Sequence, residues 1–136
     1  MNILKLNIMK RFATLILLLT TLFAVNVNAQ KVQQIKSTDV QKLISSNKNI
    51  VILDVRTPEE FSAGHIKNAV NIDVSKPDAF EKYANLDKQT QYIVYCRTKN
   101  RSGVVTNFLV NNGFTNILQM TDGIVGWNSN NLPLSK

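Results

Sequence analysis

The chain has 136 residues, a formal net charge of +7 and a single cysteine. One cysteine excludes a disulfide framework and a metal site built from several thiolates, and the basic residues form neither a run nor the aromatic-interleaved surface that binds nucleic acid. We therefore expect no nucleic-acid partner, no metal and no cofactor.

Residues 1–29 have the pattern of a secretory signal peptide. Lys10-Arg11 precede an almost wholly apolar run from Phe12, and Val27-Asn28-Ala29 ends it with small residues at the alternating positions that a signal peptidase reads. A retained membrane anchor is the alternative, although the run is about as short as a spanning helix can be. We expect cleavage and export, to the periplasm of a double-membraned bacterium or to the medium, without membrane contact afterwards.

This leader carries three of the sixteen basic residues and none of the nine acids, so the net charge of the rest is about +4. Met9 is an alternative start of translation to Met1. About 107 residues remain after residues 1–29, enough for one domain with one core. We predict a short lead at residues 30–36 and a single domain at residues 37–136.

Two helices are predicted from capping patterns. Thr38 and Gln41 form a capping-box pattern ahead of an apolar face, which predicts a helix over residues 38–46. Thr57-Pro58-Glu59-Glu60 supplies an N-cap, a proline at the first helical position and a glutamate at the third, and Gly64 follows. This second pattern predicts a short helix that ends at the glycine.

Two further helices are predicted from apolar spacing. The first begins at Pro77 and is expected to bury Phe80, Tyr83 and Ala84. The second follows the cysteine, ends at Gly113 and is expected to bury Val104, Val105, Phe108 and Leu109.

Strands are predicted where short apolar, β-branched runs occur. These runs are Ile50–Val55, Ala69–Ile72, Tyr92–Tyr95 and Asn116–Met120. Strands separated by helices form a mostly parallel sheet with helices on both faces. We therefore predict a single-domain α/β fold with a small, mostly parallel sheet, in which ligands bind beyond the carboxyl ends of the strands.

The only cysteine stands where the strand Tyr92–Tyr95 ends and a helical pattern follows. A thiol at this place lies beside the free N–H groups of a loop and of a helix start, and nearby positive charge favours the thiolate. We predict an anion-binding loop with Cys96 as the nucleophile. The residues expected to bind substrate in this loop are Arg97, Thr98, Lys99, Asn100, Arg101 and Ser102.

The length of this loop distinguishes it from the anion-binding loop of cysteine phosphatases and arsenate reductases. Cysteine phosphatases and arsenate reductases place five residues between Cys and Arg, whereas four residues separate Cys96 from Arg101 here. Ser102 stands at the position of the phosphatase arginine. The loop is therefore one residue too short to wrap a tetrahedral oxyanion in this way, which argues against phosphoryl or arsenate chemistry.

Three stretches resemble the rhodanese domain, in the right order. They are Leu53–Phe61 continuing through Gly64-His65-Ile66 and Ala69-Val70-Asn71-Ile72, the loop Cys96–Ser102, and Asp122-Gly123-Ile124-Val125-Gly126-Trp127. The resemblance covers roughly residues 35–133. It implies a rhodanese-like fold and a sulfurtransferase that moves sulfane sulfur from thiosulfate or polysulfide to cyanide or a thiol, a protein thiol included, through a persulfide on Cys96.

The sequence departs from the family pattern at one loop position, and two functions other than an enzyme remain as alternatives. Lys99 stands where many catalytic members have glycine, a departure that narrows the entrance or adds a cation and so bears on the substrate rather than on the fold. A non-catalytic binding module is one alternative, and the presence of Cys96 favours an enzyme over it. A persulfide carrier that uses Cys96 stoichiometrically is the other.

Several charged residues near the loop have two interpretations. Arg97 contacts an anionic donor or points into solvent, and we favour donor contact. Arg101 binds substrate or pairs with an acid such as Asp54 or Glu60. We expect Lys99 to be exposed.

The remaining motif residues are expected to support the site. Arg56 is expected to pair with Glu59 or Glu60, and Asp54 to accept hydrogen bonds at the end of its strand. The resemblance places His65 in the turn after the short helix, with a structural role. Trp127 is expected to close the core over the sheet together with Ile124.

Overall fold

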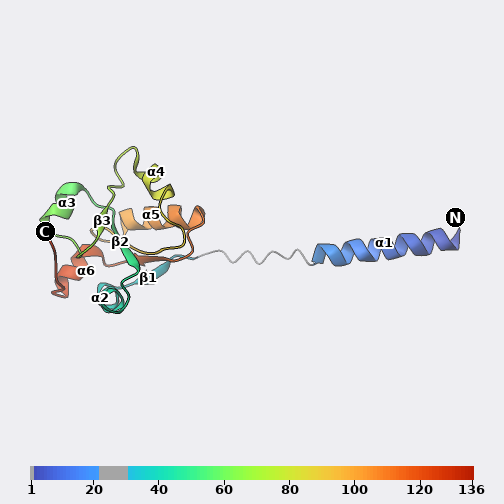
Figure 1. Cartoon of the computed structure of the whole chain (residues 1–136), viewed down its shortest axis with the longest axis horizontal. Helices are drawn as coiled ribbons and strands as arrows, with labels where there is room; N and C mark the ends of the chain where they lie inside the picture. Colours follow the sequence, from blue (N-terminus) through green and yellow to red (C-terminus); the bar gives the residue numbers. More distant parts are fainter. Residues whose placement is uncertain (1, 22–30) are drawn as a thin grey trace.

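The computed structural model describes residues 2–21 and 31–136 (Figure 1). Helices and strands alternate along most of this length. In chain order the elements are α1 (Ile3–Thr21), β1 (Gln33–Ile35), α2 (Ser37–Ser46), β2 (Ile50–Asp54), α3 (Pro58–Ala63), β3 (Val70–Asn71), α4 (Ala79–Ala84), β4 (Gln91–Tyr95), α5 (Asn100–Asn111), β5 (Ile117–Met120) and α6 (Gly123–Ser129).

Five parallel strands form one sheet in the order β1-β5-β4-β2-β3. The central strand β4 lies between β2 and β5, with Ile93 beside Ile52 on one side and beside Leu118 on the other. Because all the strands run the same way, the loops after β2, β4 and β5 leave from one edge of the sheet. The predicted single-domain α/β fold is confirmed.

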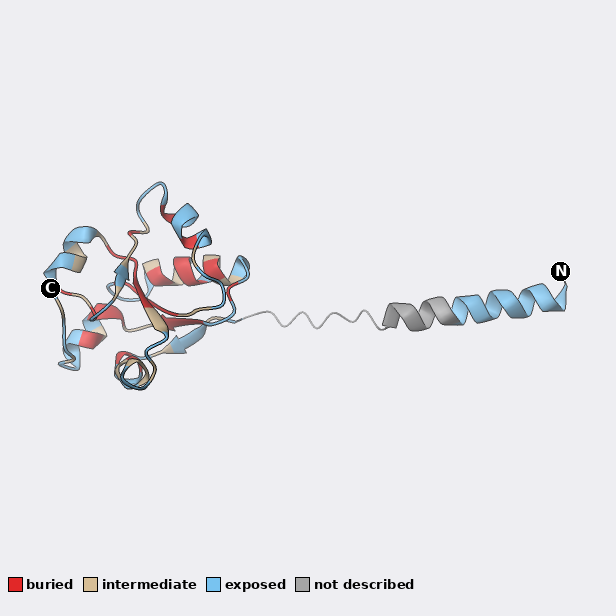
Figure 2. Ribbon diagram, viewed as in Figure 1, coloured by how far each residue is buried: buried red, intermediate tan, exposed pale blue. Residues whose placement is uncertain are grey.

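Each face of the sheet is covered by two helices, and each has its own apolar core. On one face Leu53 and Val94 pack against α4 and α5, through Tyr83 and Leu109 among others. On the opposite face the strands pack against α2 and α6, where Trp127 is 1% exposed and lies in the same cluster as Ile124. Figure 2 shows the buried residues concentrated on the strands and on the helix faces that meet them. The expected core role of Trp127 is confirmed.

The helix predicted over residues 38–46 is confirmed as α2, whereas two details at the start of the domain differ from the sequence expectation. Residues 33–35, assigned to a lead, form the edge strand β1, which pairs with β5. Helix α2 begins at Ser37, without a capping box at Thr38. Its first N–H is held instead by Asp122, whose carboxylate accepts the Ser37 backbone N–H at 3.0 Å and the Ser37 hydroxyl at 2.8 Å.

The capping box of α3 is confirmed. The Thr57 hydroxyl accepts the N–H of Glu60 at 3.3 Å, and the Glu60 carboxylate accepts the N–H of Thr57 at 3.0 Å. Pro58 begins the helix and Gly64 follows its end.

Some side chains predicted to be buried lie at the surface. Val104 is 55% exposed because Ser102, Val105, Thr106 and Leu109 form the buried face of α5. Helix α4 buries Ala79 and Tyr83. Phe80, 36% exposed, and Ala84 lie outside that buried face.

Helix α1 lies in the segment predicted to be a signal peptide, and its residues 3–14 are exposed. The predicted cleavage pattern at Val27-Asn28-Ala29 lies outside the described residues. Among the described residues, no helix combines the length and the apolar character needed to span a membrane.

Candidate active site

The thiol of Cys96 lies at the carboxyl end of the central strand. Cys96 directly follows β4, belongs to the core cluster under α5, and is 1% exposed. The next four residues are all exposed: Arg97, Thr98, Lys99 and Asn100. A buried sulfur is thus placed beneath an exposed loop that leads into a helix of twelve residues.

The first turn of α6 fixes the direction of this loop. The N–H of Ile124 donates to the Cys96 carbonyl at 2.9 Å, and the N–H of Val125 donates to the Arg97 carbonyl at 3.2 Å. In a trans peptide the C=O and N–H point in opposite directions, so the N–H groups of residues 97 and 98 point away from α6.

Gly123 permits this close approach. Its φ is +59°, and a Cβ there would lie 2.3 Å from the Arg97 carbonyl oxygen and 2.5 Å from that of Thr98. Any side chain would push α6 off the loop, which explains why the sequence has glycine at this position.

The loop leaves its backbone donors free. Within the part of the chain that the structure describes, the N–H groups of residues 97–102 donate to no acceptor. The first intrahelical hydrogen bond of α5 runs from the N–H of Gly103 to the Lys99 carbonyl, at 2.9 Å. Six successive amides beside a thiol, at the positive end of a helix dipole, form a binding place for negative charge. The predicted anion-binding loop therefore has its donors.

Two buried polar residues, Ser102 and Gln119, form a hydrogen-bond chain to the thiol of Cys96. The Cys96 thiol donates to the hydroxyl of Ser102 at 3.6 Å, and Ser102 is fully buried. Ser102 donates to the Lys99 carbonyl at 3.1 Å and accepts from the amide nitrogen of Gln119, on β5, at 3.0 Å. Gln119 was not predicted as a site residue, because nothing local in the sequence distinguishes a polar strand residue that becomes buried.

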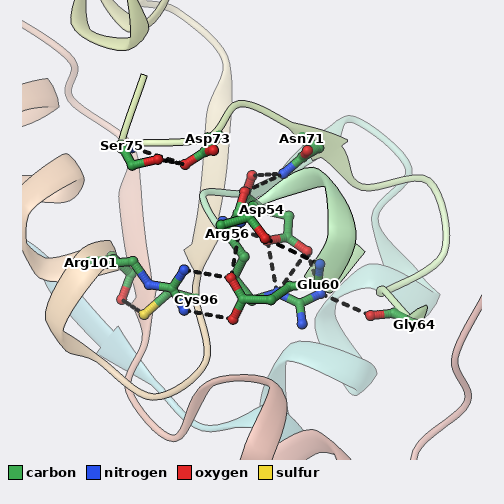
Figure 3. A network of polar contacts seen from close by, with 11 residues as sticks. Asp54, Arg56, Glu60, Gly64, Asn71, Asp73, Ser75, Cys96 and Arg101 are labelled. Atoms are coloured by element: carbon green, nitrogen blue, oxygen red, sulfur yellow. Dashed lines mark hydrogen bonds and ion pairs between the residues drawn. The ribbon is translucent and has the colours of Figure 1, made fainter. Parts of the chain in front are cut away.

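Arg56 pairs with Asp54, so the predicted pairing with Glu59 or Glu60 was wrong. The guanidinium donates to the Asp54 carboxylate at 2.7 and 3.0 Å and to the Gly64 carbonyl at 2.8 Å (Figure 3). The two side chains are 5% and 0% exposed. Burial acts to lower the pKa of Arg56, but the Asp54 carboxylate outweighs it and raises that pKa. In an extended chain, side chains two residues apart point to the same side, which brings this pair together.

Arg101 joins the loop to α3 through Glu60, one of the two acids expected as its partner. It donates to both carboxylate oxygens of Glu60, at 2.6 and 2.8 Å (Figure 3). Hydrogen bonds from Arg101 hold the pKa of Glu60 at about 2, well below its ordinary 4.5. The pair ties the anion-binding loop to the capped start of α3.

The other predicted site residues fall into two groups. Arg97 and Lys99 are exposed beside the loop amides and form no ion pair with any described residue. His65 stacks on Phe61 at 3.8 Å, its Nδ1 lies 3.0 Å from the Phe61 carbonyl, and its backbone pairs with Ser135. These contacts give His65 a structural role, as expected.

A pocket of about 250 Å³ lies elsewhere in the molecule, between α2, β2 and α6. Ile50, Ile52 and Trp127 are among its lining residues, and no residue of the loop 96–102 lines it. The buried thiol and the loop amides therefore lie apart from this pocket.

Comparison with known proteins places most of the chain in one domain family. The rhodanese-like domain profile matches residues 36–130. A sulfurtransferase of Allochromatium vinosum is 24% identical over 103 residues, which cover 76% of this chain and 94% of that protein. The thiosulfate sulfurtransferase GlpE of Pseudomonas entomophila is 33% identical over 89 residues, which cover 65% of this chain and 80% of that protein.

The fold has similar solved structures. The crystal structure of a rhodanese-related protein from Thermoplasma volcanium superposes with a TM-score of 0.68 at 32% identity, covering 76% of this chain and 97% of that one.

Proposed function

The chain belongs to the rhodanese-like domain family, and from this premise we propose that it is a sulfurtransferase that carries sulfur as a persulfide on Cys96. The observation that supports this most is the set of six successive amides at residues 97–102, which have no acceptor among the described residues and follow directly on a buried thiol. A persulfide ends in a negatively charged sulfur, and preorganised N–H donors stabilise such charge as they do an oxyanion.

We propose thiosulfate or polysulfide as the donor. The Cys96 thiolate attacks the outer sulfur of thiosulfate, a new S–S bond forms, the S–S bond of thiosulfate breaks, and sulfite leaves with its electron pair. The exposed cations Arg97 and Lys99 lie at the loop and are placed to attract a dianionic donor.

The second half of the reaction needs an external nucleophile, because the chain has no second cysteine. Cyanide or the thiolate of a small molecule or protein attacks the terminal sulfur of the persulfide. The Cys96 thiolate leaves and is regenerated, while thiocyanate or a new persulfide carries the sulfur away.

Intact mass spectrometry of the protein tests this proposal. Treatment with thiosulfate should add about 32 Da, one sulfur atom, which a cyanide wash removes. Cys96→Ser should show no gain. A gain with polysulfide but not with thiosulfate would assign polysulfide as the donor. The absence of any adduct with either donor would contradict sulfur transfer and leave a binding module.

We also propose that the protein is exported after cleavage behind Ala29. The basic pair at Lys10-Arg11, the apolar run and the small residues at its end support this proposal. Amino-terminal sequencing of the protein from the exported fraction should begin at Gln30. A chain that keeps residues 1–29 in the membrane fraction would contradict it.

A further inference from the structure

The hydroxyl of Ser102 has three neighbours and a fixed number of hydrogen-bonding positions. A serine hydroxyl offers one proton and two lone pairs. With Cys96 as a thiol, the sulfur and Gln119 both donate to Ser102, so its own proton goes to the Lys99 carbonyl. All three positions are then used inside a fully buried site.

The Lys99 carbonyl, by contrast, has more donors than it needs. It accepts from the Gln119 amide at 2.8 Å, from the N–H of Gly103 at 2.9 Å and from Ser102 at 3.1 Å. A carbonyl oxygen has two lone pairs. Because Gln119 and Gly103 already fill them, the hydrogen bond from Ser102 is the one that can be given up without leaving a buried acceptor unsatisfied.

When the sulfur of Cys96 becomes negatively charged, Ser102 must donate a hydrogen bond to it instead of accepting one. A thiolate or persulfide no longer donates and needs a donor instead, so the Ser102 proton must turn from Lys99 to the sulfur. We propose that Gln119 is a positioning residue that makes this turn possible, since its two N–H groups hold the Lys99 carbonyl and the Ser102 oxygen in both states. The persulfide part of this inference rests on the proposed function, whereas the thiolate part does not.

The surroundings of Gln119 fit this role. Gln119 is 7% exposed and held in the strand β5, so its amide is placed by a rigid element. A Cβ at Gly103 would lie 3.3 Å from the Gln119 nitrogen. Glycine inside a helix costs stability relative to alanine, and here it leaves room for the amide to reach the loop.

The decisive measurement is the pH midpoint of thiolate formation, followed by ultraviolet absorbance, which requires no reagent to reach a buried sulfur. Cys96→Ser serves as the blank, because the chain has one cysteine. Gln119→Met keeps the shape of the side chain and removes the amide. It should raise the midpoint by about one pH unit, and slow persulfide formation at neutral pH by about tenfold, the effect of weakening one hydrogen bond to a charged acceptor.

A matched control lies on the neighbouring strand. Gln34 is the register partner of Gln119 on β1 and is exposed, so Gln34→Met should leave the midpoint unchanged. The charged groups on elements around Cys96 come from the loop and α5, from β2 and α3, and from the turns before α4 and α6. They are Arg97, Lys99, Arg101, Asp54, Arg56, Glu59, Glu60, Asp73, Lys76, Asp78 and Asp122. The titratable tyrosines in the same core cluster as Cys96 are Tyr83 and Tyr92, and none of these groups changes in the variants.

A double-mutant cycle separates positioning from general destabilisation. If Gln119 acts through Ser102, then Ser102→Ala alone should raise the midpoint, and Gln119→Met should add little in the Ser102→Ala background. Additive shifts would overturn the proposal. A lower melting temperature with an unchanged midpoint would overturn it as well, because a merely structural residue has that effect.

Gly103→Ala provides a variant that keeps the amide in case Gln119→Met does not fold. The added methyl group presses on the Gln119 nitrogen and should raise the midpoint by a smaller amount, about twofold to threefold in thiolate population. An unchanged midpoint would count against the proposal. If the wild-type protein forms no persulfide by mass, the proposed function fails, and the midpoints still decide the role of Gln119.

Discussion

The loops after β2 and β4 leave the same edge of the sheet, but they differ in whether their backbone N–H groups are hydrogen-bonded. After β2, the N–H groups of Val55, Arg56 and Thr57 donate to the Tyr95 carbonyl, to Asp54 and to Glu60. After β4, the N–H groups of residues 97–102 donate to no acceptor in the described ranges. The N–H groups of the first loop are bound within the protein, whereas those of the second are available to a ligand.

This difference assigns a task to each loop. A loop whose donors are all bound is rigid and can serve as a support, and a loop with free donors gains most when an anion fills it. The two are joined by the pair of Arg101 and Glu60, in which the glutamate also caps α3. The support therefore holds the anion-binding loop in shape through a single carboxylate.

The largest effect on stability is expected from breaking the buried pair of Arg56 and Asp54 in the loop after β2. Arg56→Met removes the partner of Asp54, whose carboxylate is fully buried. Leaving a buried charge without its partner should lower the free energy of unfolding by about 3–5 kcal/mol. Urea denaturation at neutral pH measures this loss.

The exposed pair of Lys42 and Asp39 is the matched control. Its side chains are 80% and 60% exposed, so Lys42→Met should change the free energy of unfolding by less than about 0.5 kcal/mol. An equally small change in Arg56→Met would show that the loop after β2 does not depend on the buried pair.

Local signals in the sequence predicted the capped start of α3, after β2, and the nucleophile after β4. The capping box of Thr57 and Glu60 and the proline at position 58 lie within four residues, so their pattern is complete in the sequence. The thiol after β4 was likewise predictable, because a strand pattern ends at Cys96 and a helical pattern follows. Such features depend on neighbours along the chain.

Features that depend on distant contacts were missed. Strand β1 is short and polar, and its partner β5 lies far along the chain. Ser37 begins α2 because of Asp122, 85 residues away. Gln119 and Ser102 are 17 residues apart and meet only after β5 has joined the sheet. No local spacing encodes these contacts.

A smaller effect is expected from the link between the two loops. Glu60→Gln keeps an oxygen that can accept the N–H of Thr57 and removes only the charge that faces Arg101. The pKa of Glu60 falls from 4.5 to about 2 on folding, so the pair stabilises the protein fully above the unfolded value and loses this contribution as the pH falls from 4.5 towards 2. The shift alone converts to about 3 kcal/mol.

Solvent reduces that figure, because the two side chains are 33% and 29% exposed, and we expect Glu60→Gln to cost about 1–2 kcal/mol at pH 7. Urea denaturation of both proteins across the pH range should show the difference constant above pH about 5.5 and vanishing near pH 2. A difference that persists at pH 2 would mean that the glutamate acts through its shape and cap rather than its charge. The loop after β4 would then be held by packing on α6 and by Gln119, not by the ion pair.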